Sequence, residues 1–268
     1  MSSSFASADD TCLFCTADNY KQLEDKANET LQKCHNWLLS NRLTINIDKT
    51  HFLNFSKDSP TSNINLKLGN NPIVQKNDTK YLGIVLQDNL KWERHITNVI
   101  HKLNKQIPLY ISIRNALPLS KNSIIYKAIS FSLINYGIEL YGKKNTKWLK
   151  QLQKTQNRLL KILACKPRLF NTNKLHKNFG ILKIHDQAKS RLILRSHNFI
   201  YKRRKLNYAY KNMRLHSETH CRNTRNVNNF YTTSLSYSSN NTITEQSEIW
   251  WNDLPISIKS TKQRDKFK

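Results

Sequence analysis

The stretch Lys80–Ile96 has the sequence K-Y-L-G-I-V-L-Q-D-N-L-K-W-E-R-H-I and separates two patterns. Before it, short alternating runs predict strands; after it, apolar residues recur at helical spacing. Residues 80–86 themselves predict a strand in which Gly83 permits a bulge or a close backbone approach. The sequence therefore predicts an α+β protein, with a mixed region over 1–86 followed by helices.

The mixed region is expected to hold a hairpin, one helix and short strands. Residues 5–16 (F-A-S-A-D-D-T-C-L-F-C-T) suit a β-hairpin whose turn carries Asp9 and Asp10. Helical spacing of apolar residues predicts a helix over 18–40. Alternation predicts further strands at 43–47, 51–55 and 64–68.

Four amphipathic helices are predicted in the rest of the chain, at 92–107, 121–136, 146–164 and 185–204. We place domain limits at 1–86, 87–170 and 171–268. Residues 213–247 are rich in Asn, Ser, Thr and His with few aliphatic side chains, so we expect them to be poorly ordered.

Positive charge is concentrated after residue 85. The net charge is +26, yet residues 1–85 hold nine Lys/Arg and nine Asp/Glu. Residues 141–225 hold 23 basic residues and two acidic ones, Asp186 and Glu218. Such a surface attracts polyanions, and nucleic acid is the first candidate because each neutralised phosphate releases counterions. A solubilising face is the alternative, although such faces usually mix both signs.

The cysteine pattern and the hydropathy of the chain indicate the cellular compartment in which the protein is expected. The five cysteines are scattered and odd in number, which favours a reducing environment. Cys12 and Cys15 lack the second pair that a zinc site needs, so no zinc is expected. Without a signal peptide or an apolar run of about 18 residues, we expect an intracellular protein, nuclear or cytoplasmic, that is not secreted and has no membrane partner.

The adjacent carboxylates of Asp9 and Asp10 suit a divalent metal. Mg²⁺ prefers hard oxygen ligands and is held by one or two carboxylates together with substrate phosphates. An Asp-Asp pair is also common in solvent-exposed turns, so the pair alone does not define a metal site.

The order of several segments resembles the reverse transcriptases of jockey-like non-LTR (LINE-type) retrotransposons. Ala8–Thr11 (A-D-D-T) is similar to their active-site hairpin, and Trp37–Thr50 to the next palm block, with Leu43, Asn46, Lys49 and Thr50 at motif positions. Lys80–Ile96 is similar to the primer-grip region. The similarity continues through Ile134–Gly142 (I-N-Y-G-I-E-L-Y-G), Gln156–Leu163 (Q-N-R-L-L-K-I-L), the closing W-W-N-D-L-P-I-S-I-K and the final F-K.

The resemblance implies a partial palm (β-hairpin, helix and short antiparallel strands), then a basic, thumb-like helical bundle and a loosely ordered tail. It implies RNA-directed DNA polymerisation with two Mg²⁺ or Mn²⁺ ions, an RNA template, a DNA primer and dNTPs. Asp9 would ligate metal with support from Asp10, and Lys49 would lie near the nucleotide's phosphates. Tyr81, Leu82 and Gly83 would hold the primer end. The basic residues expected to bind nucleic acid are Lys102, Lys105, Lys150, Lys154, Arg158, Lys161, Arg203 and Arg204.

Two departures from the family pattern limit this expectation. The family carries Tyr or Phe two residues before the first Asp, where this chain has Ser7. The palm strand with the other metal-binding Asp has no counterpart before Asp9, so we expect a truncated copy that does not polymerise DNA alone. A non-catalytic nucleic-acid-binding module and a retrotransposon-derived relic are the alternatives. For Trp92 and His95 we favour a buried Trp with a hydrogen-bonded His over a functional role.

Overall fold

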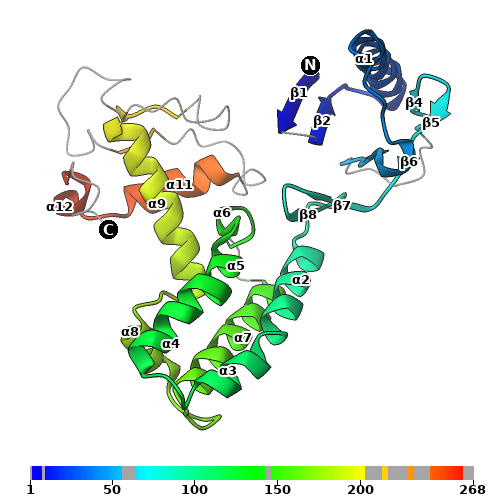
Figure 1. Cartoon of the computed structure of the whole chain (residues 1–268). Coiled ribbons are helices and arrows are strands. Elements are labelled where there is room, and N and C mark those ends of the chain that lie inside the picture. Colours follow the sequence, from blue (N-terminus) through cyan, green and yellow to red (C-terminus); the bar gives the residue numbers. More distant parts are fainter. Residues whose placement is uncertain are drawn as a thin grey trace. The chain divides into compact units, whose positions relative to one another are not determined.

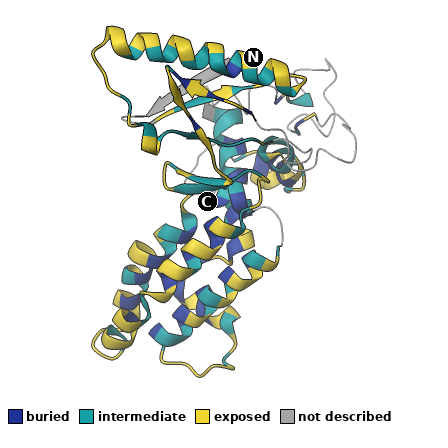
Figure 2. Ribbon diagram, turned by 90° about the vertical axis from the view of Figure 1, so that its right-hand side faces the viewer, coloured by how far each residue is buried: buried dark blue, intermediate teal, exposed yellow. Residues whose placement is uncertain are grey.

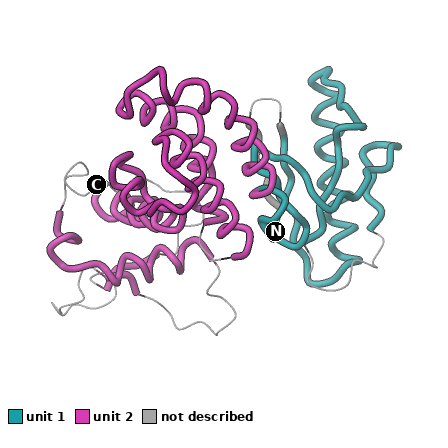
Figure 3. Tube along the Cα trace, turned by 90° about the horizontal axis from the view of Figure 1, so that it is seen from below, with its two compact units in different colours: residues 1–95 teal, residues 96–268 magenta. Residues whose placement is uncertain are grey.

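The computed structural model describes residues 2–7, 10–55, 64–142, 146–202, 213–216, 229–231 and 242–261, with only the backbone at 2–7, 10 and 202. The chain divides into two compact units, Met1–His95 and Ile96–Lys268 (Figure 3). The boundary lies inside a helix, later than the predicted limit after residue 86. Most of 87–170 shares the second unit with 171–268, which we had assigned to a separate domain.

The described residues of the first unit form four two-stranded sheets, whose strands are labelled in Figure 1. Three are antiparallel hairpins and one is a parallel pair. The hairpins are β1 (Ser2–Ser7) with β2 (Asp10–Cys15), β4 (Lys67–Leu68) with β5 (Asn71–Pro72), and β7 (Asp78–Tyr81) with β8 (Ile84–Gln87); the parallel pair is β3 (His51–Phe52) with β6 (Val74–Gln75).

Two strand predictions in this unit are wrong. Residues 43–47 form no strand; the segment instead leads into the 3-10 helix η1 (Ile47–Lys49), whose first turn is capped by Asn46. Residues 80–86 are not one strand but the end of β7, a turn and the start of β8. Alternating hydrophobicity does not distinguish these cases, because local capping and positive backbone angles decide them.

Helix α1 (Tyr20–Ser40) forms the core of the first unit with β4. It begins where the Asn19 side chain accepts from the Gln22 N–H at 2.8 Å. Its Ala27 is buried with Ile64, Leu66, Leu68 and Ile73, and these residues form one apolar cluster. The Asn28 side chain extends the sheet, since its amide donates to the Asn65 carbonyl and its oxygen accepts from the Lys67 N–H, both at 3.0 Å.

The second unit is helical. Its elements are α2 (Glu93–Asn104, which crosses the unit boundary), α3 (Ile107–Ile113), α4 (Leu119–Tyr126), the π-helix η2 (Lys127–Phe131), α5 (Ser132–Asn135), α6 (Ile138–Tyr141), α7 (Lys147–Leu163), α8 (Thr172–Phe179), α9 (Ile184–Lys202), α11 (Ile243–Asn252) and α12 (Ile256–Lys259). The predicted helices correspond to α2, α7 and α9, and the one at 121–136 to α4, η2 and α5.

Aromatic side chains and close backbone approach organise the core of the helical unit. Tyr110 and Tyr126 are buried with their ring centroids 6.5 Å apart, and Phe179 packs edge-on against Tyr126. A Cβ at Gly142 would lie 2.6 Å from the Ala188 Cβ, so only glycine lets α9 pass this close. In Figure 2 the buried residues of these helices lie along faces that meet one another.

A second cluster brings together segments that are distant in sequence. Met213, Phe230 and Trp251 are buried in it, and Leu215 forms an antiparallel bridge with Phe230. The range 213–247 was predicted to be poorly ordered, but 213–216, 229–231 and the start of α11 pack in or beside this cluster. Asn252 explains why: its side-chain oxygen accepts from the Phe230 N–H at 2.8 Å, and its amide donates to the Phe230 carbonyl at 3.0 Å.

No helix among the described residues is both long and apolar enough to cross a membrane.

Replacing Asn252 should destabilise the second unit. Asn252→Ala leaves both backbone groups of Phe230 without these partners, so we expect a loss of about 1–3 kcal/mol in urea unfolding. Asn104→Ala, at an exposed position ending α2, is the matched control. Equal stability of the two variants would show that water replaces the Asn252 bonds without cost.

Candidate active site and nucleic-acid interface

The predicted metal-binding pair lies where β1 turns into β2. Ser7 is paired with Asp10 in the antiparallel register, so the connection has two residues. Asp10 is the first residue of β2, and Asp9 lies outside the described residues. The hairpin predicted at this place is therefore present, but Asp10 belongs to its second strand rather than to the connection.

The chemistry of this pair fits a hard divalent cation. Two adjacent carboxylates provide the oxygen ligands that Mg²⁺ accepts from protein, while substrate phosphates and water supply the rest. Among the residues whose side chains the structure describes, no three of His, Cys, Asp or Glu gather as a metal-binding group. The side chains of Asp9 and Asp10 lie outside that description, so their role as metal ligands stays a prediction from the sequence.

Lys49 ends the 3-10 helix η1, and its position is set by local hydrogen bonds. The Asn46 side-chain oxygen accepts from the Lys49 N–H at 3.1 Å, and the Thr50 hydroxyl donates to the Asn46 carbonyl at 2.9 Å. These bonds give the Asn-x-x-Lys-Thr spacing a physical basis, because Asn46 and Thr50 close one tight turn. The Lys49 side chain is exposed and can meet an anion.

The Lys49 turn is connected to the β7–β8 hairpin. The His51 ring accepts or donates a hydrogen bond at both nitrogens, with Nδ1 2.9 Å from the Lys49 carbonyl oxygen and Nε2 bonded to the Thr79 hydroxyl. Thr79 belongs to β7, two residues before Tyr81. His51 therefore ties the predicted phosphate-contacting lysine to the predicted primer grip, a role that we did not assign from the sequence.

Tyr81, Leu82 and Gly83 do form a turn. Tyr81 pairs with Ile84, and both residues between them have positive φ, 46° for Leu82 and 80° for Gly83. Two positive φ angles are the mark of a type I′ hairpin turn, which favours Asn-Gly. A leucine in the left-handed region costs about 1–2 kcal/mol. The Leu82 side chain is also 45% exposed, so its burial does not offset the backbone strain. Strain that is not explained by packing points to a role of this residue at the surface.

The buried Trp with a hydrogen-bonded His that we favoured from sequence is found only in part, because Trp92 is half-buried. His95 is buried, and its Nδ1 accepts from the Val85 N–H at 3.3 Å. The Trp92 ring meets it edge-on at a centroid distance of 6.5 Å. The pair thus anchors β8 to the start of α2.

One face of α7 carries a row of cations. At about 100° per residue, five side chains fall within an arc of about 80°, and these form the α7 cation row: Lys147, Lys150, Lys154, Arg158 and Lys161. The opposite face is buried through Leu149, Leu152, Gln156, Leu159, Leu160 and Leu163. The first four cations are exposed, and Lys161 is half-buried where it donates to the Arg168 carbonyl. Among the described residues, none of the row forms an ion pair.

The other predicted basic residues are not part of this row. Lys102 lies in the last turn of α2 and Lys105 just beyond it, both exposed; a cation there also favours the helix dipole. Arg203 and Arg204 lie outside the described residues. Sequence reasoning omitted Lys147, although its spacing of three from Lys150 places it in the row.

Some cationic side chains of the second unit already interact with other side chains of the protein. Arg195 of α9 pairs with Glu139 of α6. Burial raises the pKa of the Glu139 carboxyl, while Arg195 and Arg191 oppose that rise. Arg191 also donates to the Asn135 side-chain oxygen at 3.2 Å. Their positive charge is partly neutralised by Glu139, whereas the α7 cation row has no ion pair among the described residues.

Three known proteins are similar to this chain. The RNA-directed DNA polymerase from mobile element jockey of Drosophila funebris is 26% identical over 188 residues, which are 68% of this chain and 20% of that protein. The jockey polymerase of Drosophila melanogaster is 25% identical over 189 residues, with the same shares. The probable RNA-directed DNA polymerase from transposon X-element of Drosophila melanogaster is 28% identical over 120 residues, 43% of this chain and 13% of that protein.

The chain is therefore related to the RNA-directed DNA polymerases of mobile elements. Within that class its relatives include jockey itself, which confirms the jockey-like, non-LTR resemblance of its motifs. The chain spans about a fifth of the length of the jockey polymerases that it matches. No family model and no solved structure matches it.

Replacing Leu82 tests whether the turn stores strain. Leu82→Asn creates the favoured Asn-Gly pair, so we expect the first unit to gain about 1 kcal/mol in stability. Leu43→Asn, at another exposed leucine (49% exposed) outside the turn, should give no gain. A loss of stability in Leu82→Asn would mean that the leucine side chain supports the fold.

Proposed function

We propose that this chain is the part of an RNA-directed DNA polymerase that holds a template–primer hybrid. The observation that carries the proposal is the α7 cation row opposite a buried apolar face. From Lys147 to Lys161 the row extends about 21 Å at 1.5 Å per residue, long enough to follow several consecutive phosphates of a duplex backbone. The buried face fixes the orientation of α7 about its axis. The row is therefore already in place for a duplex backbone, and binding requires no ordering of the helix.

The first unit would contribute the partial palm and the helical unit a thumb-like grip. Asp9 and Asp10 would hold Mg²⁺ or Mn²⁺, which in a complete enzyme supplies activation of the primer hydroxyl and neutralisation of the leaving pyrophosphate. Lys49 would place its ammonium against the nucleotide's phosphates from the turn closed by Asn46 and Thr50. Template RNA, primer DNA and dNTPs are the proposed partners.

The β7–β8 turn would contact the primer end through Leu82. The support is its strain: an exposed leucine keeps a positive φ where Asn or Gly would fit better. A variant that relieves the strain should therefore separate stability from function. Leu82→Asn would stabilise the unit and weaken contact with a primer terminus.

A second candidate function is a nucleic-acid-binding module without catalysis. It is favoured by the placement of the α7 cation row in Ile96–Lys268, the unit that contains neither Asp9 nor Asp10. Binding of this kind needs no metal. Hybrid binding that is unchanged in Asp9→Ala/Asp10→Ala, together with no primer extension on poly(A)/oligo(dT) with Mg²⁺, would favour this candidate over the polymerase.

Neutralising part of the α7 cation row should weaken hybrid binding and flatten its salt dependence. For Lys150→Gln/Lys154→Gln/Arg158→Gln we expect the slope of log K against log [salt] to fall by roughly 2–3, since each phosphate contact contributes about 0.9. Fluorescence anisotropy with a labelled RNA–DNA hybrid over a salt series measures it.

The matched control removes the same charge elsewhere. Lys21, Lys67 and Lys76 are exposed in the first unit, and their triple Gln variant should keep the wild-type slope. Equal slopes for both triple variants would show that net charge alone attracts the hybrid. No binding of the wild-type chain even at low salt would overturn the proposed function.

A further inference from the structure

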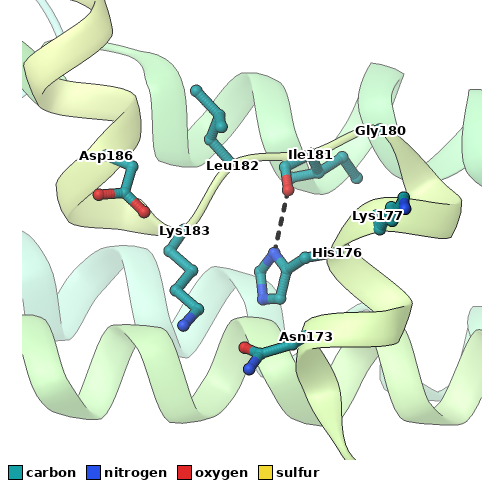
Figure 4. A pocket seen from close by; sticks show the side chains of 8 residues that line it. All are labelled: Asn173, His176, Lys177, Gly180, Ile181, Leu182, Lys183 and Asp186. Atoms are coloured by element: carbon teal, nitrogen blue, oxygen red, sulfur yellow. Dashed lines mark hydrogen bonds between the residues drawn. The ribbon is translucent and has the colours of Figure 1, made fainter.

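A hollow of about 360 Å³ lies between α8 and the start of α9 in the helical unit. Its volume is at the lower end of the roughly 300–1,000 Å³ of small-ligand clefts. The side chains that matter for its chemistry are Asn173, His176, Lys177, Ile181, Lys183 and Asp186. Figure 4 shows the His176 ring among them, with its bond to Ile181.

The wall of the hollow is held in place from α7. His176 is buried, with Nδ1 3.1 Å from the Ile181 carbonyl oxygen and Nε2 2.9 Å from the Asn157 side-chain oxygen. The Gln153 oxygen accepts from the Ile184 N–H at 2.8 Å, which fixes the first residue of α9. The same helix that presents the α7 cation row therefore sets the shape of the hollow.

Burial and nearby charges both act on the His176 ring. Burial lowers its pKa, and the Ile181 hydrogen bond opposes that shift; Lys183 lowers the pKa further and Asp186 raises it. Lys183 and Asp186 are thus both near enough to act on the ring electrostatically. The ring serves as a rigid floor, and the charged groups at the rim belong to Lys177, Lys183 and Asp186.

Asp186 is exceptional in its surroundings. Residues 146–202 contain fourteen Lys/Arg and this single carboxylate. Asp186 is exposed and makes none of the ion pairs found among the described residues. A carboxylate opposes phosphate binding, but it accepts hydrogen bonds from the amino groups on the Watson–Crick edge of an unpaired base. Its place in the first turn of α9 also suits the helix dipole, which is the purely structural explanation.

We propose that this hollow binds one unpaired nucleotide adjoining the hybrid, an inference that rests on the proposed function. Lys177 and Lys183, both exposed, would take its phosphates, and Asp186 would accept from an exocyclic amino group. Cytosine offers such a donor at the position where uracil offers a carbonyl acceptor, so cytosine is preferred over uracil.

The test compares hybrids that differ only in their single-stranded overhang. A labelled blunt hybrid, the same hybrid with a five-cytidine overhang, and one with a five-uridine overhang are titrated with the full chain at fixed salt. We expect the cytidine overhang to bind about fivefold to tenfold more tightly than the uridine overhang, as one hydrogen bond to a charged acceptor allows. Asp186→Asn keeps the shape but adds an N–H donor, so this ratio should fall to one or invert.

Further variants separate the proposal from charge and folding effects. Asp253→Asn removes one exposed carboxylate at the end of α11 and should keep the wild-type ratio. Lys177→Gln/Lys183→Gln should weaken binding of the cytidine-overhang hybrid more than binding of the blunt one. Equal affinity of the wild-type chain for both overhangs overturns the nucleotide site while blunt-hybrid binding preserves the proposed function. Loss of binding to all three hybrids overturns both.

Discussion

Burial of one face of α7 is the constraint on which the helical unit depends. Leu149, Leu152 and Leu159 are almost fully removed from water, and burying each aliphatic side chain is worth about 1.5–3 kcal/mol. That burial decides which side of the helix remains in solvent, and the sequence puts lysine and arginine there. The α7 cation row, the proposed nucleic-acid surface, is therefore a consequence of core packing rather than a separate structural element.

The same burial also has an electrostatic cost, because it holds the cations of α7 close together on one face. Like charges held along one helix repel, and few carboxylates are available to compensate: Arg195 has Glu139, but the α7 cation row has no ion pair among the described residues. A bound polyanion would remove this repulsion, so the proposed binding of nucleic acid would stabilise the helical unit. In the first unit charge is balanced, and backbone turns closed by Asn46 and Leu82–Gly83 shape the surface instead.

Long periodic segments could be predicted from the sequence, and local exceptions could not. The spacing of apolar residues was sufficient for α1, α7 and α9, because each helix buries one continuous stripe. It failed at 43–47, where the Asn46 side chain caps the 3-10 helix η1, and at 80–86, where two positive φ angles reverse the chain. The Phe230–Asn252 bonds join residues 22 apart in sequence, and no periodicity reports such a contact. The site predictions at Asp9, Asp10 and Lys49 came from motif order, and their chemistry stays a prediction.

The polar contacts beside α7 have a consequence for how this sequence can change. Gln153 and Asn157 hold α8 and α9, while their neighbours Lys154 and Arg158 face solvent. A single inserted or deleted residue within α7 would turn everything beyond it by about 100°, driving cations toward the core and leucines outward. Single substitutions along this helix keep the two faces in place, whereas insertions and deletions do not. In a copy of the chain with such a change, the cationic and apolar positions of α7 would no longer lie on opposite faces. The α7 sequence alone would show this.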